Sequence, residues 1–163
     1  MGKTALATNI AYRAARAHLT KGDRSGGAIV GFFSLEMSED QLATRIIADI
    51  SEIAGDRIRR GDVRGDELQK FIEAGQEVMQ TPLYIDQTPA LSISAVRTRA
   101  RRLKRKMGLG MIMVDYLQLL TGSGSKHGKD NRVLEVSEIT RGLKAIAKEL
   151  QIPVVALSQL SRN

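Results

Sequence analysis

Met111-Ile112-Met113-Val114-Asp115 is an apolar run that ends in a carboxylate and follows a glycine-containing break at 108–110. A short apolar run bounded in this way is typical of a strand buried on both faces of a sheet. Similar strand-like segments are expected at 28–34, 83–86 and 154–157, with helical patterns between them. This regular alternation predicts an α/β fold, in which a parallel sheet is covered by helices on both faces.

The segments between the expected strands carry apolar residues at helical spacing. Residues 3 to about 17 form the first expected helix, with a buried stripe of Leu6, Ile10, Ala14 and Ala17. Ser38, with Gln41 three residues later, predicts a capping box at the start of the next helix. Further helices are expected at 66–79, at 94–107 and in the long segment after residue 131.

Two segments rich in turn-forming residues are expected to be loops. Gly55 to Gly65 is charged and contains several turn signals, so it is predicted to be a surface connection and the least ordered part of the first half. Thr121 to Asn131 is rich in glycine and serine, which predicts a mobile loop.

Gly2-Lys3-Thr4, at the start of the first helix, matches the end of the phosphate-binding motif G-x-x-x-x-G-K-[ST]. In such a loop, backbone N–H groups and the helix dipole hold phosphate, the lysine reaches the β- and γ-phosphates, and the threonine hydroxyl ligates Mg²⁺. Met1 stands where the residue before the second glycine belongs. We therefore expect residues 1–163 to be a partial ATPase domain whose P-loop is incomplete at the N-terminus.

Four polar residues follow the expected strands: Glu36, Asp86, Asp115 and Gln159. Ligands of open parallel sheets bind at the carboxyl ends of the strands, so these residues are expected to line one edge. Asp115 is predicted to hold Mg²⁺ through water, because this cation keeps several waters and takes few carboxylates. For Asp86 a structural role is favoured, because no phosphate-binding role is left for it.

Each assignment also has a plainer explanation. Gly-Lys-Thr occurs by chance, and an acidic residue after an apolar strand, such as Asp115, can cap the next turn. Glu36 can favour the dipole of a nearby helix N-terminus, and Gln159 can be an ordinary loop residue. The occurrence of all these residues in this order is what favours a nucleotide site.

The chain has 25 basic and 18 acidic residues, for a net charge of +7. No carboxylate lies between Asp86 and Asp115, and the basic residues of that stretch are Arg97, Arg99, Arg101, Arg102, Lys104, Arg105 and Lys106. The same stretch carries an apolar stripe of Val96, Ala100, Leu103 and Met107. The basic residues are then either the solvated or subunit-contacting face of an amphipathic helix, or a direct DNA contact.

Composition excludes several other classes of protein. Cysteine is absent, which excludes disulfides and thiolate metal sites, and the two histidines lie far apart in the sequence. We see no metal cluster beyond what a nucleotide brings. No apolar run approaches the roughly 18 residues of a membrane span, and no secretory signal follows Met1, so a soluble cytoplasmic protein is expected.

Four segments together resemble the C-terminal motor of bacterial replicative DNA helicases of the DnaB type. They are Phe33-Ser34-Leu35-Glu36-Met37-Ser38, Val114-Asp115-Tyr116-Leu117-Gln118-Leu119, residues 135–144 and residues 154–162. The resemblance extends from Gly2 to Asn163. It implies a RecA-like P-loop NTPase fold, a homohexamer with ATP sites between subunits, and ATP-driven translocation on single-stranded DNA during replication.

The resemblance also implies roles for individual residues. Glu36 would polarise the attacking water, Gly2, Lys3, Thr4 and Asp115 would hold Mg-ATP, and Gln159 would report the state of the γ-phosphate. The loop at 121–131, with Lys126, Lys129 and Arg132 nearby, would contact the DNA backbone in a central channel, with an unbound linker as the alternative. Primase and a helicase loader are the further partners that the resemblance implies.

The resemblance is incomplete at both ends. The strand before the P-loop and the later segment that would carry an arginine finger are missing from residues 1–163, so weak hydrolysis is expected of this chain alone. Three hypotheses follow: a replicative helicase motor, a RecA-like ATPase of repair or recombination, and an oligomerisation or binding fragment that has lost catalysis.

Overall fold

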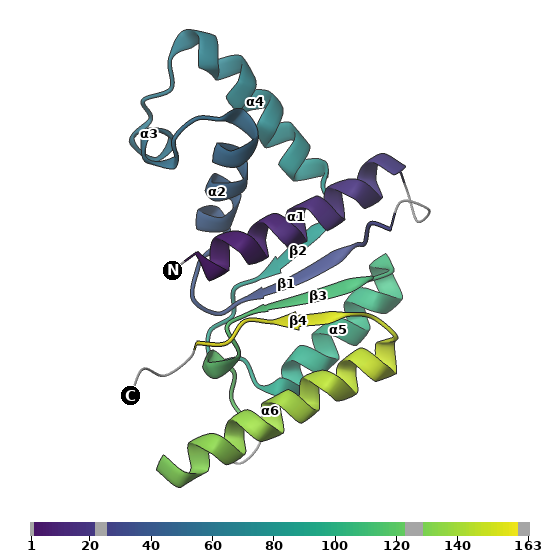
Figure 1. Ribbon diagram of the computed structural model, residues 1–163. Helices are drawn as coiled ribbons and strands as arrows, with labels where there is room; N and C mark the ends of the chain where they lie inside the picture. The colour runs from purple at the N-terminus through teal and green to yellow at the C-terminus, as the bar shows by residue number, and fades with distance from the viewer. Residues whose placement is uncertain (1, 22–25, 123–128, 160–163) are drawn as a thin grey trace.

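A parallel sheet forms the centre of the protein (Figure 1). The computed structural model describes residues 2–21, 26–122 and 129–159, with residues 129–132 described by their backbone alone. The strands are β1 (Val30–Ser34), β2 (Leu83–Asp86), β3 (Met111–Asp115) and β4 (Val154–Ala156), in the order β2-β1-β3-β4. All neighbouring pairs are parallel, which confirms the α/β prediction.

Helices cover both faces of the sheet (Figure 1). On one side lie α1 (Lys3–Lys21), α2 (Glu39–Ser51), α3 (Gly55–Arg60) and α4 (Gly65–Gln80), of which α2 to α4 extend beyond the sheet as an arm. On the other side lie α5 (Ile93–Met107) and α6 (Lys129–Leu150), while a short 3₁₀ helix, η2 (Leu117–Leu119), follows β3. None of the described helices is both long and apolar enough to cross a membrane.

The strands contribute to two separate hydrophobic cores, because successive side chains of a strand point to opposite faces. Phe33, Ile112 and Val114 pack with residues of α5 and α6, including Val96 and Ile146. The alternate strand residues Val30, Phe32, Met111 and Met113 pack with α1 and with Leu42 of α2. This burial on both sides explains why the strands are almost uniformly apolar.

The buried face of α1 differs from the predicted stripe. Ala7, Ala11 and Ala15 are fully buried, whereas Leu6 is 63% exposed and Ile10 is 42% exposed. Small side chains allow the helix axis to approach the sheet closely, so the alanine face makes the contact while Leu6 and Ile10 are left outside. The prediction was wrong for Leu6 and Ile10, whereas Ala14 packs against the core as expected.

Residues 55–65 are more ordered than predicted, because α3 occupies their first half. Gly61, with φ of 70°, ends α3 in a left-handed conformation and donates its N–H to the carbonyl of Ile58. The guanidinium of Arg57 then binds the carboxylate of Glu67 in α4 through two hydrogen bonds of 2.8 and 2.6 Å. A bidentate pair of this kind ties α3 to α4.

Other predicted elements agree with the structure more closely. The Ser38–Gln41 capping box at the start of α2 is confirmed in both directions. The expected loop at 121–131 extends too far, because the backbone is already helical from Lys129. Ile139, Leu143 and Ile146 form the buried stripe of α6, because they recur at helical spacing toward the sheet.

Candidate active site

Lys3 lies at the carboxyl-terminal edge of the sheet, where α1 begins. Its Nζ donates a hydrogen bond of 3.1 Å to the carbonyl oxygen of Ser158, just past β4. The N–H of Leu6 donates to the carbonyl of Gly2, so the N–H groups of residues 3–5 lie ahead of the helical hydrogen-bond ladder. Free helix N–H groups beside an exposed ammonium are an arrangement that can bind phosphate.

Asp115 ends β3 at the same edge and is only 2% exposed. It lies in register with Ser34 of β1. Its Oδ2 atom is buried and has no hydrogen-bond partner within the described part of the chain. A buried carboxylate oxygen without a partner is unfavourable, so this atom suits a cation or a cation-bound water.

The donor set at this edge fits Mg²⁺ better than a metal held by protein ligands alone. Asp115 and the Thr4 hydroxyl are the kinds of oxygen ligand that Mg²⁺ takes beside water and phosphate. Within the ranges that the structure describes, His, Cys, Asp and Glu form no group of three or more that could enclose a metal. A cation would therefore have to arrive with further oxygen ligands, as a nucleotide provides.

Glu36 lies in the bend between β1 and α2. The N–H of Leu35 donates to the carbonyl of Asp115 at 2.9 Å, so the β1–β3 ladder continues one residue past the strand. The Ser34 hydroxyl donates to the carbonyl of Met37 at 2.6 Å and closes the bend. Glu36 is exposed between these anchors. An exposed carboxylate on an anchored bend can orient a water molecule and accept its proton.

Gln159 lies past the end of β4, on the opposite side of Asp115 from Glu36. It is held there by Gln118 of η2. The Gln118 Nε2 donates to the Gln159 carbonyl at 2.9 Å and to the Ser158 hydroxyl at 2.9 Å. The Gln159 N–H donates to the Gln118 Oε1 at 3.3 Å. Sequence reasoning did not assign Gln118 a role. Its signals were its position three residues after Asp115 and its place in one of the four segments that carry the resemblance, but its partner lies 41 residues away.

Asp86 belongs to a different environment, as its preferred structural role predicted. Its carboxylate accepts hydrogen bonds from Arg99 and from the N–H of Thr88, the latter at 3.0 Å. Burial raises the pKa of this carboxyl, but the hydrogen bonds from Arg99 and Thr88 outweigh burial and the pKa is lowered. Asp86 thus ties the end of β2 to α5.

The residues expected to contact DNA are not brought into the site by the described structure. Lys126 lies outside the described residues. Lys129 and Arg132 fall in the first turns of α6 by their backbone, and their side chains are not described. Their role stays a prediction.

The whole chain, residues 1–163, matches the family described as the DnaB-like helicase C terminal domain. The chain belongs to this family. It is 51% identical to the replicative DNA helicase DnaB of Rickettsia felis, over 99% of this chain and 33% of that protein. It is 48% identical to the replicative DNA helicase DnaC of Bacillus subtilis, over 100% of this chain and 34% of that protein. The chain thus spans about a third of these relatives.

Two solved structures share the fold of this DnaB-like domain. One is an ATPase domain, which superposes with a TM-score of 0.78 at 30% identity, over 96% of this chain and 54% of that one. The other, a DnaB-like replicative helicase described with its interactions with primase, gives a TM-score of 0.76 at 30% identity, over 95% of this chain and 36% of that one. The RecA-like fold expected from the resemblance is therefore confirmed.

Proposed function

We propose that this chain is the ATP-hydrolysing motor of a replicative DNA helicase, which translocates on single-stranded DNA and unwinds duplex. The observation that carries the proposal is the match of all 163 residues to the DnaB-like C-terminal family. The convergence of Lys3, Asp115 and Gln159 at the carboxyl-terminal strand ends supports it, because parallel sheets bind nucleotides there.

The residues of this chain divide the chemistry of hydrolysis among themselves. Gly2, Lys3 and the start of α1 bind the triphosphate. Glu36 orients the attacking water and accepts its proton as the water oxygen bonds to the γ-phosphorus, while the bond from that phosphorus to the β–γ bridging oxygen breaks and ADP leaves. Asp115 and Thr4 would hold Mg²⁺, which would neutralise phosphate charge. Gln159 responds to the γ-phosphate, and its contact with Gln118 links it to η2.

The proposed partners follow from the family and from a structural neighbour. Single-stranded DNA would be held by the segment at 121–131, with Lys126, Lys129 and Arg132, because a few cations and backbone N–H groups suffice for binding without sequence preference. A homohexamer with ATP sites at subunit interfaces, and association with primase and a loader in the cytoplasm, complete the proposal. The neighbour described with primase supports that association.

The proposal is tested by ATP hydrolysis in the full-length protein, with and without single-stranded DNA. Single-stranded DNA should stimulate the rate. Glu36→Gln should lower kcat by about 10²- to 10⁴-fold while ATP binding is retained, because the lost group moves a proton and does not contact phosphate in the ground state. Glu73→Gln is the matched control, because Glu73 is an exposed residue of α4.

Three outcomes would contradict the proposal. A wild-type protein that hydrolyses ATP with no response to single-stranded DNA would not be a translocating motor. Strand exchange without unwinding would instead indicate the repair or recombination ATPase. No hydrolysis in the full-length wild type would indicate a protein that serves only binding or assembly.

A further inference from the structure

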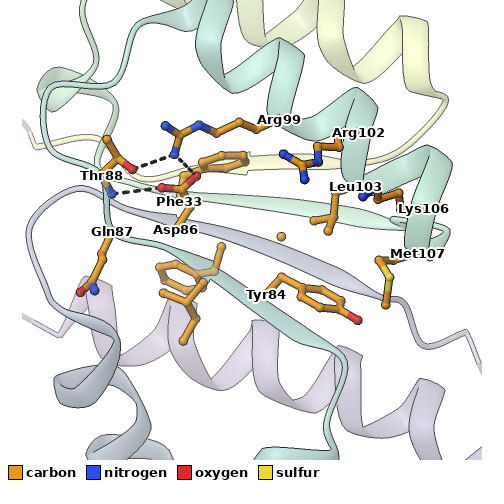
Figure 2. A pocket seen from close by; sticks show the side chains of 13 residues that line it. Phe33, Tyr84, Asp86, Gln87, Thr88, Arg99, Arg102, Leu103, Lys106 and Met107 are labelled. Atoms are coloured by element: carbon orange, nitrogen blue, oxygen red, sulfur yellow. Dashed lines mark hydrogen bonds and ion pairs between the residues drawn. The ribbon is translucent and has the colours of Figure 1, made fainter.

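An open pocket of about 610 Å³ lies on the α5 side of the sheet (Figure 2), and Lys3, Asp115 and Gln159 are not among its lining residues. Within the described residues β2 is the edge strand of the sheet, and Leu103 of α5 packs against β1 at Gly31. None of the pocket's lining residues is among those assigned to ATP binding or hydrolysis above.

The floor of the pocket is largely apolar. Gly31 of β1 and Tyr84 of β2 are neighbours in register, and both line the pocket. Leu103 and Met107 of α5 line its side (Figure 2). An added Cβ at Gly31 would lie 3.2 Å from a methyl carbon of Leu103, which shows how close the helix comes. Such a floor can accept an apolar or aromatic side chain.

The basic residues of α5 fall into two groups. Arg97 and Arg101 both pair with Glu149 of α6, and Arg99 pairs with Asp86. These three charges are neutralised within the chain and tie α5 to its neighbours. The remaining cations are Arg102, Lys104, Arg105 and Lys106, which have no ion pair with a carboxylate in the described part of the protein.

Arg102 and Lys106 line the pocket, whereas Lys104 and Arg105 do not. The two lining cations are four residues apart on one helix, so they stand one above the other along the same face. Figure 2 shows both on α5, on the same wall as Leu103. The pocket therefore combines an apolar floor with a pair of cations that no described carboxylate neutralises.

We propose that this pocket binds an acidic peptide segment of a partner protein, with an apolar side chain of the segment on the floor and its carboxylates on Arg102 and Lys106. Charge complementarity favours this partner, since two uncompensated cations suit carboxylates and the floor suits an apolar anchor. The open shape suits an extended segment, and β2, beside the pocket, is the edge strand among the strands that the structure describes.

The lining favours a peptide over nucleic acid. Asp86 is part of the pocket, and its hydrogen bonds from Arg99 and Thr88 keep it ionised because they lower its pKa. Because Asp86 and Arg99 neutralise each other, only Arg102 and Lys106 add uncompensated charge to the lining, whereas a phosphate backbone binds best to extended positive surfaces. A peptide can direct its own N–H groups toward Asp86 and its carboxylates toward Arg102 and Lys106.

The test uses a fluorescein-labelled peptide in which a phenylalanine is flanked on both sides by aspartates, with anisotropy measured on the full-length protein. The Arg102→Ala/Lys106→Ala double variant should weaken binding by about tenfold or more. The Lys104→Ala/Arg105→Ala double variant removes the same charge from the same helix and should change affinity by less than about twofold. Replacement of the phenylalanine by serine should also weaken binding.

Each other outcome would overturn the proposal. Absence of peptide binding to wild type would do so directly. An equal loss of affinity in both double variants would indicate nonspecific electrostatic attraction of the peptide to the basic residues of α5. An unlabelled single-stranded oligonucleotide that binds through Arg102 and Lys106 while the peptide does not would make this a nucleic-acid surface. Loss of oligomers in sedimentation of the Arg102→Ala/Lys106→Ala variant alone would show that a second copy covers the pocket. Circular dichroism checks that both double variants fold.

Discussion

The side-chain amide of Gln118 hydrogen-bonds to both backbone polar groups of Gln159, donating to its carbonyl and accepting from its N–H. The amide thereby makes the two backbone hydrogen bonds that a residue of a neighbouring strand would make, past the last β3–β4 pair, Val114 and Ala156. Gln118 also donates to the hydroxyl of Ser158, and the carbonyl of Ser158 accepts from Lys3. The contact therefore connects Gln159 to Lys3, the two residues proposed to interact with phosphate. Gln118 is a positioning residue in this arrangement.

Gln118→Leu should reduce single-stranded DNA stimulation of ATP hydrolysis by about tenfold. It removes the hydrogen bonds that hold Gln159, while each bond contributes only about 1 kcal/mol to stability. The measurement is kcat with and without single-stranded DNA, together with the melting temperature. Gln76→Leu, on the exposed side of α4, is the control. If stimulation and KM for ATP are unchanged in Gln118→Leu, Gln118 has no positioning role.

Lys3→Ala should weaken the binding of a fluorescent Mg-ATP analogue by roughly 10- to 100-fold, since hydrogen bonds to charged groups contribute about 1.5–3 kcal/mol. Lys144→Ala, an exposed lysine of α6, should bind like wild type. Saturable binding that is equal in Lys3→Ala and wild type would mean that phosphate is bound elsewhere.

The Arg57–Glu67 pair should make the arm sensitive to acid. The hydrogen bond from Arg57 is the largest cause that lowers the pKa of Glu67 to about 2, from an ordinary value of 4.5. A carboxyl group whose pKa is lowered by folding stabilises the folded state at any pH above its pKa in the unfolded chain. That contribution is lost as the pH falls from about 5 toward 2. The urea midpoint of wild type should exceed that of Glu67→Gln at about pH 7, and the difference should shrink over this window. Glu73→Gln, with an exposed carboxyl on the same helix, should show no such window.

Two glycine substitutions should change stability in opposite directions. A Cβ at Gly142 in α6 would lie 2.4 Å from the Cγ1 atom of Ile93 in α5, so Gly142→Ala should destabilise by about 1–3 kcal/mol. A Cβ at Gly75 in α4 would meet nothing within 4 Å, so Gly75→Ala should stabilise by about 0.5–1 kcal/mol through helix propensity. Urea denaturation of both variants measures their free energies of unfolding. Equal changes in the two variants would show that the α5–α6 contact is looser than described.

Most of the strand positions and the residues that follow them could be predicted, because they depend on local patterns. Asp115 after its apolar run and the Ser38–Gln41 capping box are of this kind. The buried face of α1 could not be predicted from hydrophobicity, because the close approach of a helix to a sheet selects Ala7 and Ala11 over Leu6. The helix α3 was not predicted, because it is tied to α4 by the hydrogen bonds between Arg57 and Glu67, which lie ten residues apart.

The sequence by itself determined which segments become strands, which polar residues stand at their ends and which family the motifs resemble, since each is encoded over a few neighbouring residues. Tertiary structure alone decided the strand order, the contact of Gln118 with Gln159, and the division of the α5 cations into paired and unpaired groups. These features depend on residues distant in the chain, whose meeting is set by the packing of the whole sheet and its helices.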